Sequence, residues 1–165
     1  KIFEYARKNL DAIITVPDED LVVAFLDMVE NHKMIVENSG LLTVAALKQL
    51  NVKNKRVVSI LSGGNMDVIT MSSVVQQGLI MRDRIFTVSV LLPDKPGELS
   101  RVADVIAKKN GNVIKLEHNQ FVSINRNAAV ELRITLEAFG TEHKNQIIEA
   151  LNESGYKPKL VQAKI

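Results

Sequence analysis

The sequence predicts a two-part protein, with an α/β half over residues 1–80 and an α+β half over residues 81–165. Three observations support this division. In the first half, short apolar runs alternate with helical patterns, which is typical of a parallel sheet covered by helices on both faces. The second half follows the order β-α-β-β-α-β, the ferredoxin-like arrangement. It opens with a charged segment, Met-Arg-Asp-Arg at 81–84, which is a candidate hinge.

Helices and short strands alternate in the first half. Apolar residues at helical spacing predict helices at 1–10, 18–29, 41–50 and 66–77. Apolar, largely β-branched runs predict buried strands at 12–16, 34–36 and 56–61. Three parallel strands leave open sheet edges, so further strands are expected upstream of Lys1.

The second half has a different pattern. Strands are predicted at 85–92, 112–124, 128–136 and 156–161, with a turn at 125–127. Helices are predicted at 99–109 and 140–151, and Asn110-Gly111 is a candidate left-handed cap. The two helices would cover one face of an antiparallel sheet, and a second copy is expected to pair with the other.

Composition excludes several classes of function. The formal net charge is only +2, from 21 basic and 19 acidic residues, so no nucleic-acid partner is predicted. No apolar run is long enough for a bilayer, so no membrane partner is predicted either. With no cysteine there is no disulfide and no thiolate site, which fits a reducing cytoplasm. The three histidines have no metal-ligand spacing and no triad partners, so no metal site is expected.

The strongest local motif is Ser62-Gly63-Gly64-Asn65, between a predicted strand and a predicted helix. Two glycines allow close approach to a ligand, and the helix start supplies free N–H groups. A tight turn that needs glycine only for its geometry explains the motif equally well. Glu37 follows the preceding strand in the same manner, and there capping of the next helix competes with a role in a ligand crevice.

Two segments resemble the late catalytic-domain segments of threonine dehydratases, which are pyridoxal-phosphate enzymes of the tryptophan-synthase-β-like class (fold type II). These are Val-Glu-Asn-Ser-Gly at 36–40 and Val-Val-Ser-Ile-Leu-Ser-Gly-Gly-Asn at 57–65. The resemblance implies that Ser62 hydrogen-bonds the pyridine nitrogen of the cofactor and that Glu37 lies near its ring. Gly63 and Gly64 would let the backbone pass close by. The implied reaction of the parent enzyme converts L-threonine to 2-oxobutanoate and ammonia.

Two motifs of that family do not occur in this sequence. One is the Ser-x-Lys-x-Arg-Gly segment with the cofactor-linking lysine, and the other is the glycine run that holds the phosphate. The eight glycines are scattered, apart from Gly63-Gly64. Pyridoxal phosphate is therefore not expected to bind stably to this chain alone, and no catalytic residue is assigned in it. The chain is expected to be the C-terminal portion of a longer enzyme.

Residues 91–99, Leu-Leu-Pro-Asp-Lys-Pro-Gly-Glu-Leu, resemble the first loop of ACT regulatory domains, where a Pro-Gly-x-Leu turn enters the first helix. The free amides of that helix start can receive a carboxylate. The resemblance implies an amino-acid effector held where two copies pair, between this loop and the partner's second strand. The predicted effector contacts are Asp94, Pro96, Gly97, Glu98, Leu99, Asn112 and Val113. An unliganded β-turn is the competing interpretation of the loop.

The start of the predicted second strand departs from the ACT pattern. Asn112 stands one residue earlier than the Asn of the Gly-x-Asn-Ile motif in many amino-acid-binding members. One step along a strand reverses the side-chain face. Asn112 is therefore predicted either to point away from the effector or to line the site through its backbone.

The leading functional hypothesis is a catalytic-domain portion over 1–80 joined to an ACT domain over 81–165. Isoleucine or valine is the expected effector of a biosynthetic enzyme, whereas a nucleotide is the expected effector of some catabolic relatives. The expected assembly is a homodimer or a tetramer. The alternative is a non-enzymatic, amino-acid-binding ACT regulator. A lysine-bearing segment and a glycine run upstream of Lys1 would decide for the lyase.

Overall fold

The computed structural model of the protein describes residues 1–119 and 130–163. The chain divides into two compact units, Lys1–Gly78 and Leu79–Ile165, and each is considered by itself. The boundary predicted from the sequence, after residue 80, lies near this division. That the first unit is catalytic and the second regulatory stays a prediction.

The second unit has the predicted ferredoxin-like topology. Its four strands form one sheet in the order β2-β3-β1-β4, with every neighbouring pair antiparallel. The elements are β1 (Ile85–Leu92), α5 (Glu98–Lys108), β2 (Asn112–Asn119), β3 (Val130–Glu137), α6 (Thr141–Glu153) and β4 (Lys159–Val161). The predicted turn at 125–127 and the end of the predicted strand 112–124 lie outside the described residues.

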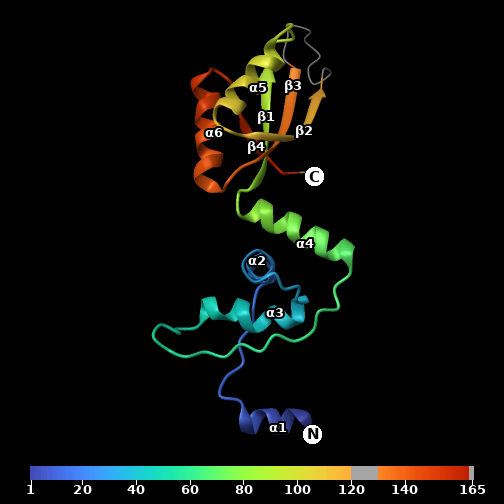
Figure 1. The fold of residues 1–165 in the computed structure, drawn as a ribbon, viewed down its shortest axis with the longest axis vertical. Coiled ribbons are helices and arrows are strands. Elements are labelled where there is room, and N and C mark those ends of the chain that lie inside the picture. Colours follow the sequence, from blue (N-terminus) through green and yellow to red (C-terminus); the bar gives the residue numbers. More distant parts are fainter. Residues whose placement is uncertain (120–129, 164–165) are drawn as a thin grey trace. The chain divides into compact units, whose positions relative to one another are not determined.

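Strand alternation builds the core of this unit. Every second residue of the central strands β1 and β3 is buried. Most of these residues form one hydrophobic cluster with side chains of α5 and α6, which lie on the same side of the sheet (Figure 1). The fully buried side chains include Val88, Val90, Leu132, Ile134, Leu136, Val102, Ile106, Ile147 and Leu151. Burial of each such side chain contributes about 1.5–3 kcal/mol, so this cluster supplies the main stabilisation of the unit.

A positive-φ residue stands at each end of α5, and the one after the helix was predicted from the sequence. Gly97 precedes the helix with φ 91°. Asn110 follows it with φ 58°, the left-handed conformation predicted for the Asn-Gly pair. Together they return the chain from β1 through the helix to β2.

The helices of residues 1–81 match the sequence-based predictions in number and place. They are α1 (Ile2–Asn9), α2 (Asp18–Asp27) with a π-helical turn (Met28–His32), α3 (Asn38–Ala45) with a 3-10 turn (Ala46–Gln49), and α4 (Val68–Met81). Phe25 and Leu41, each 0% exposed, lie at the centre of their shared core. No helix in the described part of the chain is long and apolar enough to cross a membrane.

The predicted parallel sheet of the first unit is not formed. Segments 12–16, 34–36 and 56–61 are not strands, and every strand of the described chain lies in the second unit. Ile13, Val58 and Ile60 are 82%, 89% and 72% exposed, whereas a sheet covered on both faces would bury them. An apolar, β-branched run indicates that a segment needs burial, but it does not supply the neighbouring strand that a ladder requires. The prediction of three strands here was therefore wrong for this structure.

Candidate functional site

The structure brings Glu37 and the Ser62–Asn65 loop together. The Glu37 backbone N–H donates a hydrogen bond to the Gly63 carbonyl oxygen, with an N···O distance of 3.3 Å. The Glu37 carboxylate accepts a hydrogen bond from the Ser39 hydroxyl at 2.6 Å and one from the Asn65 backbone N–H at 3.2 Å. The two segments that the sequence singled out thus form one polar cluster, named here the Glu37 cluster: Glu37, Ser39, Ser62, Gly63, Gly64 and Asn65.

Two glycines are required by the packing of this cluster. Gly63 has φ +80°, and a Cβ there would lie 2.5 Å from the Glu37 side-chain carboxyl carbon. A Cβ on Gly40 would lie 1.9 Å from the backbone oxygen of Ser62, which is far inside van der Waals contact. Gly64 is packed less closely, since a Cβ there would lie 3.3 Å from its nearest neighbour, the Ile35 carbonyl oxygen. The packing within the cluster therefore explains why glycine stands at position 63, without invoking a ligand. Gly40 is required by the same close approach of the two segments.

Helix α3 fixes the segment that leads into the loop. The Thr43 hydroxyl donates to the Ile60 carbonyl oxygen at 2.9 Å, and the Ser59 hydroxyl donates to the Thr43 carbonyl oxygen at 3.4 Å. Ser62, Gly63 and Gly64 themselves are exposed, while Glu37 is half-buried. The cluster consequently presents a serine hydroxyl and a carboxylate on an open surface, a donor set able to meet a polar ligand.

The predicted effector loop leaves β1 and turns into α5. Its backbone is closed by hydrogen bonds from Lys95 N–H to the Pro93 carbonyl oxygen at 2.8 Å and from Glu98 N–H to the Lys95 carbonyl oxygen at 3.4 Å. Asp94, Pro96 and Gly97 are exposed. Glu98 forms an ion pair with Arg101 at 2.9 Å, and Leu99 is 43% exposed.

The remaining predicted effector residues lie at the opposite end of the sheet. Asn112 and Ile85 both pair with Glu137, so Asn112 is level with the start of β1, whereas the loop follows its last residue, Leu92. At about 3.3 Å per residue the strand separates the two groups by roughly 23 Å. One chain therefore does not bring the loop and Asn112–Val113 together.

A β-bulge interrupts β2 shortly after Asn112. The register shifts between Val113 and Lys115, so the alternation of faces is interrupted there. Asn112 shares the side of Glu137, and its side-chain amide donates to a Glu137 carboxylate oxygen at 3.1 Å. Whether Asn112 contacts an effector stays a prediction.

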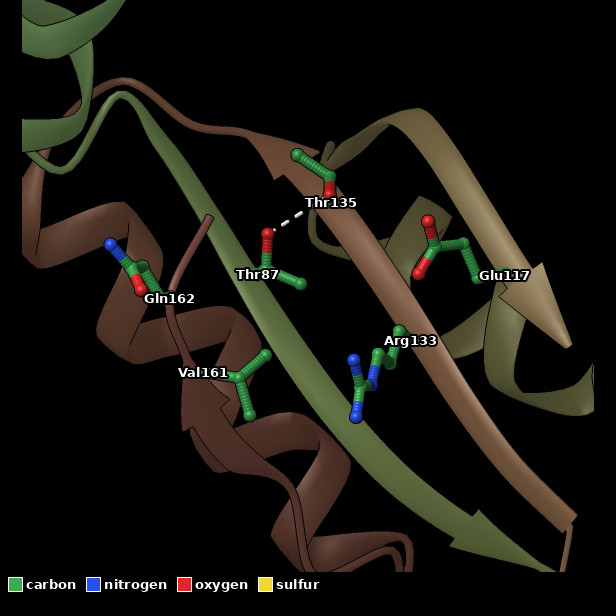
Figure 2. A pocket seen from close by; sticks show the side chains of 6 residues that line it. All are labelled: Thr87, Glu117, Arg133, Thr135, Val161 and Gln162. Carbon is green, nitrogen blue, oxygen red and sulfur yellow. Dashed lines mark hydrogen bonds between the residues drawn. The ribbon is translucent and has the colours of Figure 1, made fainter. Parts of the chain in front are cut away.

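Sequence reasoning missed a cavity on the face of the sheet that the helices do not cover. It has a volume of about 130 Å³ and is lined by Thr87, Glu117, Arg133, Thr135, Val161 and Gln162 (Figure 2). The signal was present in the sequence, since polar residues occupy the alternate positions of three strands: Thr87 and Ser89, Glu131, Arg133 and Thr135, and Lys115 and Glu117.

The charges beside this cavity are held by specific partners. The Glu131 carboxylate accepts a hydrogen bond from the Ser89 hydroxyl at 2.7 Å and one from Arg133 Nε at 3.1 Å. The Ser89 hydroxyl, and then Arg133, lower the pKa of Glu131 below its ordinary value. Glu131 therefore stays ionised at neutral pH and holds the Arg133 guanidinium in place.

No protein-family model matches the chain, but two curated relatives align with nearly all of it. The chain is 29% identical to the L-threonine ammonia-lyase of Thermotoga maritima over 160 residues, 96% of this chain and 40% of that protein. It is 34% identical to the L-threonine ammonia-lyase of Geobacter sulfurreducens over 156 residues, 93% of this chain and 39% of that protein. The chain thus spans about two fifths of their length.

Solved structures show only a partial likeness. The X-ray structure of prephenate dehydratase from Streptococcus mutans matches 46% of this chain and 40% of its own, with 21% identity and a TM-score of 0.40. The sequence relatives confirm the resemblance to threonine dehydratases, because the similarity runs through both units.

Proposed function

We propose that this chain is the C-terminal part of a pyridoxal-phosphate-dependent threonine ammonia-lyase, which converts L-threonine to 2-oxobutanoate and ammonia. The single observation that carries the proposal is the similarity to proteins of that name along 93–96% of the chain. A non-enzymatic regulator is disfavoured because the similarity extends well into the first unit. The reducing cytoplasm is the compartment proposed for the enzyme.

The first unit would contribute one side of the cofactor pocket. Pyridoxal phosphate, when bound, supplies an electron sink for the substrate's α-carbon. The exposed Ser62 hydroxyl suits a hydrogen bond to the ring nitrogen, and as a neutral group it does not hold that nitrogen protonated. Glu37, fixed by Ser39 and the Asn65 N–H, would lie beside the ring. The linking lysine and the phosphate-binding glycines would come from the rest of the enzyme.

The exposed apolar surface of the first unit supports its place in a larger domain. Ile2 and Phe3 are 86% and 75% exposed, and Val58 is 89% exposed. Large apolar side chains with this much exposure are expected to contact another part of a protein. We propose that the remaining catalytic domain covers these side chains and completes the sheet that segments 12–16, 34–36 and 56–61 do not form here.

The second unit would be the regulatory domain. Because the effector loop and Asn112–Val113 lie at opposite ends of one sheet, a shared site needs two copies, with the loop of one beside β2 of the other. An amino acid such as isoleucine or valine, or else a nucleotide, would shift the equilibrium between two arrangements only if it binds one of them more tightly.

The substitution Ser62→Ala in the complete enzyme tests the role of the Glu37 cluster. We expect turnover of L-threonine to fall by on the order of tenfold to a hundredfold, since a hydrogen bond to the reacting system is lost. Cofactor content after desalting, measured by absorbance, should fall much less. Ser59→Ala is the matched control, because its hydroxyl bonds the Thr43 carbonyl oxygen instead. Unchanged turnover in Ser62→Ala would show that Ser62 has no such role.

A further inference from the structure

We propose that the open face of the four-stranded sheet binds the ammonium and carboxylate groups of a small α-amino acid, in the cavity between Thr87, Thr135, Arg133 and Glu117. The inference rests on the proposed sensing role for its biological meaning, and it names a site separate from the loop at 93–97. The proposal rests on the arrangement of side chains from all four strands of the sheet. The name "sheet-face cavity" is used below for this site.

A hydroxyl pair forms the floor of the sheet-face cavity. The Thr87 and Thr135 side-chain oxygens lie 2.9 Å apart and are hydrogen-bonded to each other. The two residues are 5% and 4% exposed, although they lie on the side of the sheet without helices. Each hydroxyl has one hydrogen, and only one of the two is used between them. The other hydrogen, together with the remaining lone pairs, is available to a ligand above the floor.

A cation and an anion stand next to this floor. Arg133 and Glu117 are direct cross-strand neighbours on β3 and β2, so their Cβ atoms are about 5 Å apart. Each has an ion-pair partner on its own strand, Glu131 for Arg133 and Lys115 for Glu117, both at 3.1 Å. Glu131 binds Arg133 through Nε. Figure 2 shows the side chains of Arg133, Thr87 and Thr135 around the sheet-face cavity. Val161 lies on its other side.

This combination of groups matches a zwitterion. A guanidinium binds a carboxylate with two parallel hydrogen bonds, and a carboxylate binds an ammonium group. A ligand with both groups on one carbon can satisfy Arg133 and Glu117 together and use the free hydroxyl hydrogen of the floor. A simple anion meets only Arg133 and a simple amine meets only Glu117, so each makes fewer charge-assisted hydrogen bonds than an amino acid does.

The cavity is large enough for a small head group. Its volume of about 130 Å³ is close to the ~150 Å³ cavity that accommodates benzene in another protein. The α-carbon with its two charged groups fits this space, and Val161 supplies apolar lining for a short side chain.

The test is isothermal titration of L-alanine, L-threonine and L-isoleucine into the chain, with ethylamine and propionate as probes that carry one charge each. At least one amino acid should bind, and both single-charge probes should bind at least tenfold more weakly. Arg133→Gln and Glu117→Gln should each weaken amino-acid binding at least tenfold, and Arg133→Lys should weaken it less. Lys108→Gln and Glu149→Gln, on the helices, should leave it unchanged.

Three outcomes would overturn the proposal. Binding that survives Arg133→Gln and Glu117→Gln but is lost in Asp94→Asn would move the ligand to the loop and leave the sensing role intact. No binding of any amino acid would remove the sheet-face site, while the lyase activity of the complete enzyme is measured separately. Sedimentation showing a dimer that Arg133→Gln dissociates, without amino-acid binding, would assign this face to a second copy. Thermal unfolding of each variant checks that it is folded.

Discussion

At the scale of single residues, the account depends on how closely two backbone segments approach at the Glu37 cluster. A Cβ on Gly40 would lie only 1.9 Å from the Ser62 carbonyl oxygen, and a Cβ on Gly63 would lie only 2.5 Å from the Glu37 carboxyl carbon. The Ser62 carbonyl oxygen is a backbone atom, which can move only if its whole segment moves. The Glu37 carboxyl carbon belongs to a side chain, but Gly63 also has φ +80°, which a residue with a Cβ rarely adopts.

Gly40→Ala and Gly63→Ala should therefore both destabilise the first unit, by about 1–3 kcal/mol each, through overpacking and backbone strain. Gly64→Ala is the control, because the added Cβ would lie 3.3 Å from its nearest neighbour. This substitution should change the free energy of unfolding by less than about 1 kcal/mol. Urea unfolding followed by circular dichroism measures the differences. Equal stability of Gly40→Ala and the unmodified chain would show that the segments do not approach as closely as described.

The sequence predicted part of this cluster and missed another part for physical reasons. Glycine and serine after an apolar run are local signals, so Glu37 and Ser62–Asn65 were found. The contact of Gly40 with Ser62 joins residues 22 positions apart and leaves no local pattern. The Thr87–Thr135 pair of the sheet-face cavity depends in the same way on strand register, which only the tertiary structure fixes.

At the scale of elements, Asp83 joins the segment before β1 to the start of α6. Its carboxylate accepts a hydrogen bond from the Lys144 ammonium group at 2.7 Å and another from the Thr141 hydroxyl at 2.8 Å. The Lys144 and Asp83 side chains are only 14% and 27% exposed. The Lys144 hydrogen bond, with Thr141 adding to it, holds the pKa of Asp83 below its ordinary value.

Asp83→Asn should lower the free energy of unfolding by about 1 kcal/mol at pH 7, because it removes the charge that faces Lys144. A carboxyl whose pKa is lowered by folding stabilises the protein above its unfolded pKa of 3.8, and this contribution disappears as the pH falls through the folded pKa. The free energies of unfolding of Asp83→Asn and of the unmodified chain should therefore become equal as the pH is lowered from 5 towards 2. Urea titrations at several pH values measure this. A difference that stays constant over that range would contradict the assignment to the ionised Asp83.

The elements also show where pattern reading works. Helix periodicity and caps are local, and α1 to α6 were all predicted near their observed positions. The β-bulge at Val113/Lys115 reflects pairing with β3 and has no signature within β2 itself. The strands predicted at 12–16, 34–36 and 56–61 failed because ladder formation depends on neighbours that residue type does not specify.

At the scale of the whole molecule, the two units differ in how completely they bury their apolar residues. The strands β1 and β3 of the second unit hold a closed core, with Val88, Val90 and Leu132 all 0% exposed. The first unit leaves Ile13 and Ile60 largely exposed. This contrast agrees with the proposal that the second unit is a domain in its own right and the first is part of a larger one.

Hydrogen exchange of this chain should show the contrast directly. The amides of β3, which is paired on both sides, should exchange slower than those of 56–61 by on the order of a hundredfold or more. Mass spectrometry of peptic peptides from the two segments gives both rates in one experiment. Equal protection would mean that 56–61 is in a hydrogen-bonded ladder after all.

The central claim is that the complete protein containing this chain is a threonine ammonia-lyase whose second unit senses an effector. The most direct measurement is the rate of 2-oxobutanoate formation from L-threonine by that protein loaded with pyridoxal phosphate, with and without isoleucine, valine or a nucleotide. The account predicts steady turnover that at least one of these effectors changes severalfold. Failure of the loaded protein to form 2-oxobutanoate would contradict it.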